Sequence, residues 1–426
     1  MRAIVLESHG GPELLRVVER PEPVAGSGEV VVEVAAVAVN RLDIWVREDV
    51  GHAYAARLPL IPGYDIAGTV RTLGEGVSEV AVGERVYVHY DFSCGRCAYC
   101  LEGDEAACAA YGVMGVDRDG GYAERIVAPV RNLFTIADSL SFEHAAAAGS
   151  VYLTAYHMLF SRAGLRPGES VLVTAAGSGV GAAAIALARY AGARVFTTAS
   201  TAEKRERAAS SGAEAVLDYT RADWTDELRE LTGGRGVDLV VDHVGRAVFA
   251  DALTVLANKG RIVFCGASSG ARAEVDLIDL FARQLSIIGS SDGSRRELFE
   301  VLRLLGEGRV DPPPIEAVLP LSEAARAQEL LSSRAHFGRV LLAPQEAIPP
   351  PSPSRFVPLT TVHSSEARKS AADATSSGRP RRAKGVRERE YSRTSGESGS
   401  STGRVRILPG ATAFTMMPRG PKSTAS

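Results

Sequence analysis

The sequence predicts an α/β protein in which an antiparallel, Greek-key-like β domain precedes a doubly wound parallel sheet and a disordered C-terminal tail. Three observations carry this prediction. Short β-branched runs separated by turn residues fill the first 140 residues, strands and helices alternate after them, and the chain from residue 346 is rich in Ser, Pro, Gly and Arg. A chain of 426 residues is long enough for two or more domains.

The β domain is expected to span residues 1–148, because apolar runs of strand length recur through it. These runs cover residues 3–6, 29–39, 65–74, 84–90 and 123–129. Gly-Pro, Gly-Ser-Gly and Val-Gly-Glu turns separate them, and short strands punctuated in this way favour an antiparallel arrangement.

The pattern changes at Ser141, a residue type that often caps helices, where a helical run begins. Strand-like runs at 170–175, 194–199, 237–245, 261–267 and 285–291 then alternate with helical runs at 180–193, 202–213 and 248–260. Strands joined through helices indicate βαβ units and a parallel sheet, which we expect over 149–290. Two helices and a final strand in 291–345 are expected to return the chain to the first domain.

Charge divides the chain at the start of the predicted tail. Residues 346–426 carry 14 Lys and Arg against 6 Asp and Glu, which leaves a net charge of −11 on residues 1–345. A polar segment without an apolar period cannot bury enough surface to offset its ordering entropy. The tail is either an inert extension or a tether to nucleic acid or a membrane through "RPRRAK".

Four of the five cysteines lie close together in residues 91–112. No apolar run is long enough to cross a bilayer and no signal peptide is evident, so we expect a soluble, cytoplasmic protein in a reducing compartment. Clustered thiols then favour a zinc ion over disulfides or free thiols. Four thiolates leave no open coordination position, so the ion would order the loop without taking part in the reaction. The ligands would be Cys94, Cys97, Cys100 and Cys108.

A glycine-rich turn between a strand and a helix, "VLVTAAGSGVGAAAIALA", predicts a dinucleotide-binding site. Glycines allow the backbone to approach a pyrophosphate at the positive end of the helix dipole. The predicted residues are Gly177, Ser178, Gly179, Val180 and Gly181. The alternative is a glycine turn that serves only tight packing of the helix on the strand.

The end of the next strand favours NADP(H) over NAD(H). An acidic residue there would bind the ribose hydroxyl of NAD and repel a 2′-phosphate, but this strand ends in Ala199 and Ser200. Lys204 and Arg205 follow, and a hydroxyl with nearby cations suits a phosphate. The alternative is that both basic residues form an ordinary solvated helix face.

These segments resemble the medium-chain dehydrogenase/reductase superfamily over about residues 1–343. The resemblance rests on "VNRLDIWVR", "GDEAACAAYGVMGVDRDGGYAERIVAP", "AAGSGVG", "DLVVDHVG", "GRIVFCGASSG" and "HFGRVLL". It implies a GroES-like catalytic domain, a Rossmann domain and, from the C-x2-C-x2-C-x7-C spacing, the structural zinc lobe of zinc-binding alcohol dehydrogenases. "VNRLD" and "DHVG" look most like the quinone oxidoreductase branch.

The resemblance also implies where the family holds a catalytic zinc. The matching positions here are Asn40, Tyr64, Asp65 and Ser150, which include no thiol or imidazole. Amide, phenol and hydroxyl groups are poor zinc ligands, so we expect no catalytic zinc. His52 is the nearby imidazole, and a lone histidine in that stretch favours a loop residue.

Without a Lewis acid, hydride transfer to a quinone or an enone is easier than oxidation of an unactivated alcohol. Asn40 and Tyr64 are the candidate hydrogen-bond donors, and Asp43 is expected to orient Asn40. The alternatives are a turn-forming amide for Asn40, a core ring for Tyr64 and a helix cap for Asp43.

Further positions are expected to line the cofactor. The resemblance places Thr154 near the nicotinamide and Arg339 near the pyrophosphate, with a helix threonine and a surface charge as the alternatives. His243 and Cys265 lie at strand ends, where ligands of such sheets bind. His243 is interpreted as cofactor lining, and Cys265 either lines the site or is a small buried side chain.

The sequence therefore predicts an NADP(H)-dependent reductase of a small quinone or α,β-unsaturated carbonyl, with one structural zinc. The alternatives are an alcohol dehydrogenase with an atypical metal site and a non-catalytic scaffold or regulator that binds the cofactor. The resemblance implies a homodimer or homotetramer. Neither a membrane nor a nucleic-acid partner is expected, although the basic tail leaves nucleic acid open.

Overall fold

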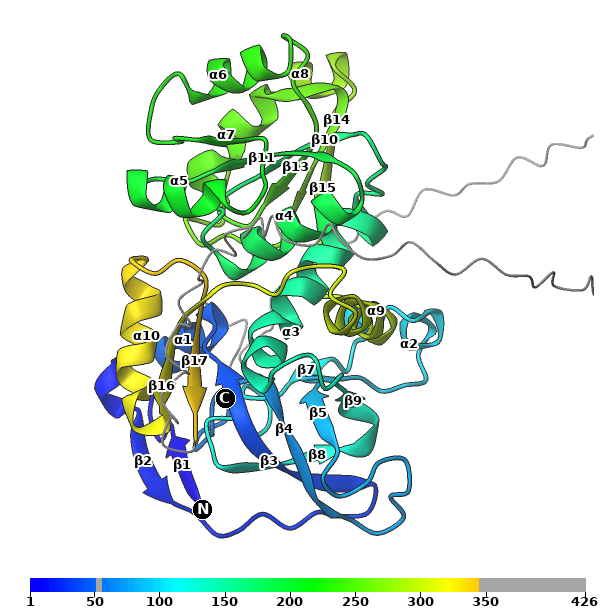
Figure 1. The fold of residues 1–426 in the computed structure, drawn as a ribbon, viewed down its shortest axis with the longest axis vertical. Helices are drawn as coiled ribbons and strands as arrows, with labels where there is room; N and C mark the ends of the chain where they lie inside the picture. The colour runs from blue at the N-terminus through cyan, green and yellow to red at the C-terminus, as the bar shows by residue number, and fades with distance from the viewer. Residues whose placement is uncertain (51–55, 345–426) are drawn as a thin grey trace, which may run out of the picture. The chain divides into compact units, whose positions relative to one another are not determined.

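The computed structural model describes residues 1–50 and 56–344, which belong to one compact unit, Met1–Ser354 (Figure 1). This unit contains an antiparallel β domain and a parallel α/β domain, so the predicted fold class is confirmed. The predicted tail and His52 lie outside the described residues. No helix in the described ranges combines the length and apolar character that a membrane span requires.

The β domain is built on a seven-stranded sheet in the order β16-β17-β3-β4-β5-β9, with β8 also paired to β3. Its strands are β3 (Glu29–Ala38), β4 (Asp65–Leu73), β5 (Arg85–Val88), β8 (Arg125–Pro129), β9 (Leu133–Thr135), β16 (Ile315–Pro320) and β17 (Arg339–Ala343). The pairs β3–β4, β3–β8, β4–β5 and β5–β9 are antiparallel, as predicted. Two short strands, β1 (Arg2–Val5) and β2 (Arg16–Glu19), form a separate antiparallel pair.

The second sheet has six parallel strands in the order β12-β11-β10-β13-β14-β15. They are β10 (Ser170–Val173), β11 (Arg194–Thr198), β12 (Ala215–Leu217), β13 (Val237–Asp242), β14 (Leu256–Phe264) and β15 (Ser286–Gly289). Numbered along the chain, this order is 3-2-1-4-5-6, the order of a dinucleotide-binding sheet. The ligand crevice of such a sheet lies where the strand order reverses, which here is between β10 and β13.

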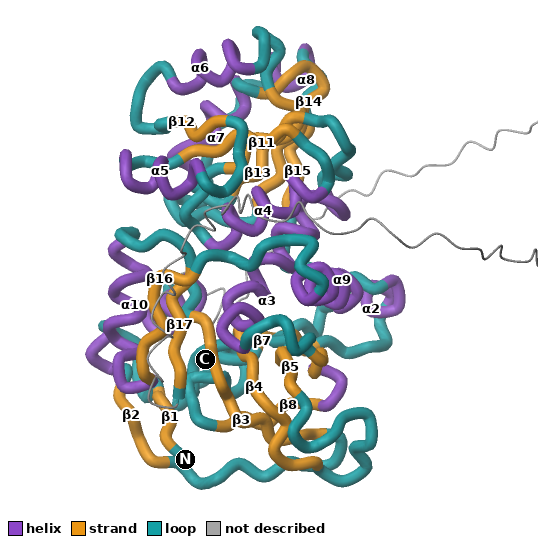
Figure 2. The backbone as a smooth tube through the Cα atoms, viewed as in Figure 1, coloured by secondary structure: helices purple, strands orange, loops and turns teal. Residues whose placement is uncertain are grey.

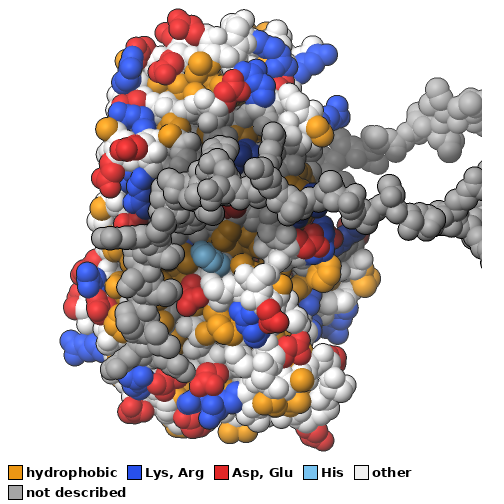
Figure 3. Space-filling model, viewed as in Figure 1, with side chains coloured by type: hydrophobic (Ala, Val, Ile, Leu, Met, Phe, Trp, Pro, Cys, Tyr) orange, Lys and Arg blue, Asp and Glu red, His pale blue; other side chains and the backbone are white. Residues whose placement is uncertain are grey.

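Helices pack beside the parallel sheet (Figure 2), and its two central strands, β10 and β13, are buried along nearly their whole length. The helices are α4 (Gly179–Tyr190), α5 (Ala202–Ala209), α6 (Trp224–Leu231), α7 (Arg246–Thr254) and α8 (Leu277–Ala282). Alternate residues of β10 show the two-residue period: Val171 and Val173 join one buried cluster, and Leu172 joins another. Acidic and basic side chains are interspersed over the described part of the face in Figure 3.

Helix α3 (Phe142–Tyr156) connects the two domains. Ser141 caps it as predicted, because its hydroxyl oxygen accepts a hydrogen bond from the His144 backbone N–H at 3.1 Å. Four consecutive buried alanines, residues 145–148, let this helix pack against β3, β4 and α4. At Gly149 a Cβ would lie 2.2 Å from the Tyr87 ring, so close contact at this point requires glycine.

The C-terminal segment returns to the β domain through α9 (Arg295–Gly306), α10 (Ala324–Ser333) and β17. Strand β16, which pairs in parallel with β17, was not predicted, because its short run after three prolines is stabilised only by that distant partner. The helix expected over 248–260 is also wrong in its second half. It ends at Thr254, because Leu256 starts β14 and pairs with Val237 in the neighbouring strand.

Candidate functional site

A cavity of about 520 Å³ lies between the β domain and the carboxyl ends of β10, β11, β13, β14 and β15. Its wall contains most of the residues predicted from the sequence. They are Asn40, Tyr64, Thr154, Gly177, Ser178, Gly179, Val180, Ser200, Lys204, His243 and Arg339. Cys265 also lines it, and burial raises the pKa of this thiol to about 12, which keeps it protonated. Gly181 and Asp43 lie outside the wall.

The glycine turn at the start of α4 forms one side of the cavity. At Gly177 a Cβ would lie 2.8 Å from the Phe337 ring, and at Gly179 it would meet Val151 and Arg339 at 2.8 and 2.9 Å. At Gly181 it would lie 2.4 Å from the Ala175 carbonyl oxygen. These three positions are therefore too tight for a side chain, and the turn leaves the N-terminus of α4 open to the cavity, which suits a pyrophosphate.

Ser178 connects this turn to His243. Its hydroxyl oxygen accepts from the Gly181 N–H at 2.9 Å and lies 2.6 Å from His243 Nε2. When the hydroxyl donates to Nε2, the imidazole proton lies on Nδ1, which has no partner among the described residues. Burial lowers the pKa of His243, so the ring is neutral. The Ser178 hydroxyl therefore fixes the orientation of the neutral His243 ring beside the glycine turn.

Three basic side chains, Arg41, Lys204 and Arg334, gather at the end of the cavity near Ser200. None of them is ion-paired with a carboxylate of residues 1–50 or 56–344. Burial, and then the charge of Arg334, lower the pKa of Arg41, so the two guanidinium groups are close enough to repel. Unpaired, crowded cations suit an anionic ligand.

Two of these cations, Arg41 and Arg334, were not predicted from the sequence. Arg41 follows Asn40 directly and could have been found from that position. Arg334 could not, because 130 residues separate it from Lys204, whose Nζ donates to the Arg334 carbonyl oxygen. Arg205 does not join this group, since it is paired with Asp218 at 2.7 Å.

Asp65 is the centre of the polar network on the β-domain side of the cavity, and its side chain is fully buried. Its carboxylate accepts hydrogen bonds from Asn40 Nδ2 at 2.9 Å and from the Ser150 hydroxyl at 2.5 Å. It also accepts from the Tyr87 hydroxyl at 2.8 Å and pairs with Arg339 Nη2 at 3.0 Å. Asn40 has no amide hydrogen left, because Nδ2 also donates to Ala38 and Oδ1 accepts from Arg339.

The residues at the family's catalytic-zinc positions do not fit a zinc ion. Asn40 and Ser150 direct their polar atoms at Asp65, and the carboxylate is engaged by four side chains. No thiol or imidazole is among them, and the nearest cation is the Arg339 guanidinium. This part of the cavity offers hydrogen bonds rather than a metal-binding set.

Tyr64 differs from its neighbours in this network because its hydroxyl has no hydrogen-bond partner in the described part of the chain. The ring lines the cavity and packs edge-on against Tyr90, with ring centroids 4.8 Å apart. Burial, followed by the charge of Asp65, raises the pKa of Tyr64 well above its usual value. The phenol therefore stays protonated and is available as a donor.

The same end of the cavity is aromatic, with Trp45, Tyr90 and Tyr111 in its wall, and Asp292 is the acidic residue among the described lining. Tyr90 donates to Asp292 Oδ1, and the Tyr111 hydroxyl lies 2.7 Å from Asp292 Oδ2 and 2.6 Å from Asp91 Oδ1. Burial, then the charge of Asp292, raises the pKa of Asp91. When Asp91 is protonated, its carboxyl group can donate to the Tyr111 hydroxyl while that hydroxyl donates to the Asp292 carboxylate.

Asp43 lies behind the wall and stabilises the start of α1 (Arg41–Glu48). Its Oδ2 accepts from the Asn40 backbone N–H at 2.8 Å, as part of a capping box, and from the Tyr122 hydroxyl at 2.9 Å. Burial raises the pKa of Asp43 to about 7. The Asp43 carboxylate thus fixes the backbone of Asn40 and makes no hydrogen bond to the Asn40 side chain.

The four predicted zinc ligands converge beside α2 (Ala98–Glu102), with their sulfur atoms within 4.8 Å of one another. Cys94 and Cys97 lie 3.9 and 3.5 Å from Cys100, sulfur to sulfur. A tetrahedral zinc with bonds of about 2.3 Å requires sulfurs about 3.8 Å apart, so the cluster fits this ion. The Cys94 and Ala110 N–H groups donate to the Cys108 sulfur at 3.5 and 3.4 Å.

We expect one zinc per chain, and none in the Cys108→Ser variant, because three thiolates cannot close the site. The variant should bind the cofactor as the parent does, since no hydrogen bond between described residues joins the lobe to the glycine turn. Metal analysis of the purified chain, together with cofactor titration, checks both points. Zero or two equivalents in the parent would contradict the site.

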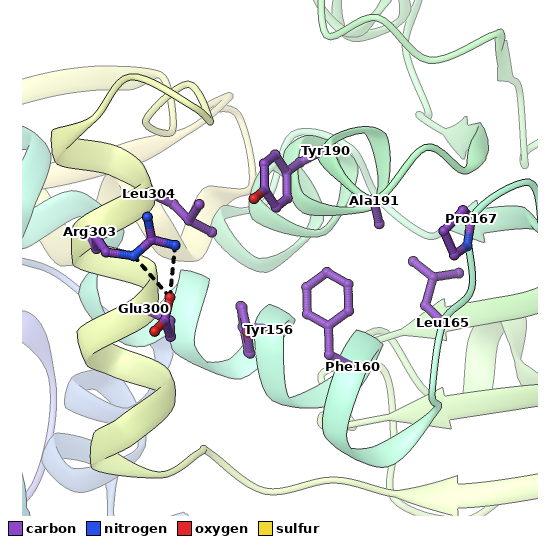
Figure 4. Close-up of a pocket in the computed structure, with 9 residues that line it drawn as sticks. All are labelled: Tyr156, Phe160, Leu165, Pro167, Tyr190, Ala191, Glu300, Arg303 and Leu304. Carbon is purple, nitrogen blue, oxygen red and sulfur yellow. Dashed lines mark hydrogen bonds and ion pairs between the residues drawn. The ribbon is translucent and has the colours of Figure 1, made fainter. Parts of the chain in front are cut away.

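A second cavity, of about 300 Å³, lies between α3, α4 and α9 (Figure 4). Tyr190 and Ala191 line it at the C-terminal end of α4, whereas the main cavity meets the N-terminus of that helix. Arg303 in its wall is paired with Glu300. The two cavities are therefore separate, and none of the predicted site residues lines the smaller one.

Comparison with known proteins agrees with this architecture. Two family models match: "Alcohol dehydrogenase GroES-like domain" over residues 26–138 and "Zinc-binding dehydrogenase" over 179–307. Quinone oxidoreductase from Rattus norvegicus is 30% identical over 349 residues, which cover 80% of this chain and 97% of that protein. Alcohol dehydrogenase from Geobacillus stearothermophilus is 32% identical, with coverages of 80% and 99%. A crystal structure of an NAD-dependent alcohol dehydrogenase is 45% identical, with coverages of 80% and 99% and a TM-score of 0.78.

A GroES-like domain, a Rossmann domain and a cavity between them define an oxidoreductase of the dehydrogenase type. The chain belongs to the medium-chain dehydrogenase/reductase superfamily, as the two family models and the full-length relatives show. The predicted family is thereby confirmed.

Proposed function

We propose that this protein transfers hydride from NADPH to a quinone or an α,β-unsaturated carbonyl without a catalytic metal. The observation that carries the proposal is the engagement of Asn40 and Ser150 by Asp65, which leaves the Tyr64 hydroxyl as a donor that no described residue of this network engages. One neutral donor can stabilise the oxygen of a conjugated carbonyl as it gains charge. The similarity to quinone oxidoreductases supports this substrate class.

The residues divide between the two ends of the cavity. The glycine turn, with Arg339 beside it, would hold the pyrophosphate, and Thr154 and His243 line the wall of the same cavity. The bound cofactor supplies the hydride. Tyr64 donates a hydrogen bond to the substrate oxygen. Asp65 and Arg339 hold the Asn40 side chain in the cavity wall, and Asp43 positions Asn40 through its backbone.

NADPH is the proposed cofactor because the end of β11 offers a hydroxyl and cations in place of a carboxylate. Ser200 and Lys204 line the cavity there, and Arg334 adds a cation that the sequence did not indicate. The NAD-dependent alcohol dehydrogenase that is 45% identical provides the competing expectation, so cofactor choice needs a direct test.

We expect an NADPH preference of about ten- to a hundredfold, because solvent weakens the charge-assisted hydrogen bonds to a 2′-phosphate. Lys204→Ala should raise the Michaelis constant for NADPH and barely alter that for NADH. Ala199→Asp should reverse the preference by placing a carboxylate against the phosphate. Arg205→Ala is the matched control, since Arg205 is one residue away but paired with Asp218. Equal kinetics with both cofactors in the parent enzyme would contradict the assignment.

An alcohol dehydrogenase is the second candidate, favoured by the 32% and 45% identical relatives. A screen of quinones, enones and secondary alcohols with both cofactors, followed by absorbance of the reduced nicotinamide, separates the two. We expect turnover of a quinone or an enone at one zinc per chain. Oxidation of alcohols alone, at two zinc ions per chain, would favour the second candidate. Cofactor binding without turnover of any of these compounds would favour a scaffold or regulator.

A further inference from the structure

Tyr111 lies where the four-cysteine lobe meets the substrate end of the cavity. It follows Cys108 by three positions, and its backbone N–H donates to the Cys108 carbonyl oxygen at 3.0 Å. The Tyr111 side chain lines the cavity, and its hydroxyl lies 2.6 Å from Asp91 and 2.7 Å from Asp292. Asp91 precedes the first zinc ligand, Cys94, by three positions, so both ends of the lobe meet at this hydroxyl.

Asp292 comes from the other domain, in the loop between β15 and α9. Its φ of 51° lies in the left-handed region, which few residues other than glycine adopt. Aspartate adopts this region more readily than most residues, and the phenols of Tyr90 and Tyr111 hold the Asp292 side chain by binding both of its carboxylate oxygens. We call Tyr111 with Asp91 and Asp292 the Tyr111 bridge.

The bridge reaches the substrate end but not the cofactor end. No hydrogen bond or ion pair within the described ranges joins residues 91–112 to the glycine turn, Ser200 or Lys204. A change in the lobe can therefore move the aromatic wall and Asp292 without disturbing the phosphate-binding residues.

We propose that Tyr111 is a substrate-positioning residue and that the metal-bound lobe acts on substrate binding through it. The identity of the substrate rests on the proposed function, but the coupling does not. The lobe then does more than order a surface loop, because it sets the position of one wall of the cavity.

The first test is Tyr111→Phe, which keeps the ring and removes the hydroxyl. The variant should retain one zinc and its NADPH affinity. We expect KM for 1,4-naphthoquinone to rise about tenfold or more, the usual effect of losing a hydrogen bond to a charged group, and kcat to change less than threefold. Tyr99→Phe, an exposed tyrosine of the same lobe, is the control and should change neither constant. The proposal would be overturned if Tyr111→Phe and Tyr99→Phe had the same KM and kcat. It would also be overturned if Tyr111→Phe weakened NADPH binding as much as it raised KM for the quinone.

The second test is a double-mutant cycle of Cys108→Ser with Tyr111→Phe. We expect Cys108→Ser alone to raise both KM and the amide exchange rate of residues 286–294. In a chain that already carries Tyr111→Phe, Cys108→Ser should change each of these two quantities by less than about twofold. Additive effects would overturn the coupling, because the lobe would then act by another route. Coupled exchange without turnover of any quinone or enone would support the bridge and contradict only the proposed substrate class, since exchange needs no turnover.

Discussion

Tyr64→Phe is expected to lower kcat for quinone or enone reduction by about 10²–10³-fold, the usual loss when one donor to a developing oxyanion is removed. The phenol is the donor in this network that no other described group engages, and burial keeps it protonated by raising its pKa. Loss of the hydroxyl leaves the substrate oxygen without that stabilisation in the transition state.

The fold should survive this change, because phenylalanine keeps the edge-on contact with Tyr90 at 4.8 Å. Thermal unfolding and NADPH titration of Tyr64→Phe check that point. Tyr190→Phe is the matched control, since Tyr190 lies in the wall of the smaller cavity. A kcat of Tyr64→Phe within threefold of the parent would show that the donor lies elsewhere.

Asp65→Ala is expected to lower the free energy of unfolding by about 3–5 kcal/mol, the cost of leaving a buried ionic partner uncompensated. The Arg339 guanidinium, only 6% exposed, would lose its carboxylate at 3.0 Å. Asn40, Tyr87 and Ser150 would lose their acceptor at the same time. Activity should fall with stability, because Asn40 and Arg339 both face the cavity.

Urea denaturation measures the free energy of unfolding of the Asp65→Ala variant and of a control variant, Glu214→Ala. Glu214 pairs with Arg194 at 2.6 Å, but both side chains are nearly half exposed, so its loss should cost about 0.2–1 kcal/mol. Similar costs for the two variants would mean that the Asp65 network contributes little to stability and that its arrangement serves another purpose.

The local structures that were predicted correctly are those that depend on short stretches of sequence. The glycine turn, the Ser141 cap and the four-cysteine cluster each depend on residues close together in the chain, so their geometry follows from spacing. Two of the errors fell where a distant partner decides the local structure. Strand β16 forms beside β17, and the second half of the expected helix 248–260 becomes strand because β13 offers it a parallel neighbour.

The site shows the same division. The sequence by itself determined which residues stand at the family's catalytic-zinc positions, because a thiol or an imidazole is either present or absent there. Only the tertiary structure decided what those residues do: Asp65 and Arg339, 274 positions apart, meet in the interior, engage Asn40 and Ser150, and leave Tyr64 free. Arg334 and Asp292 join the cavity wall in the same way. No local pattern encodes such contacts, because they join strands and loops that are far apart in the sequence and come together only in the folded chain.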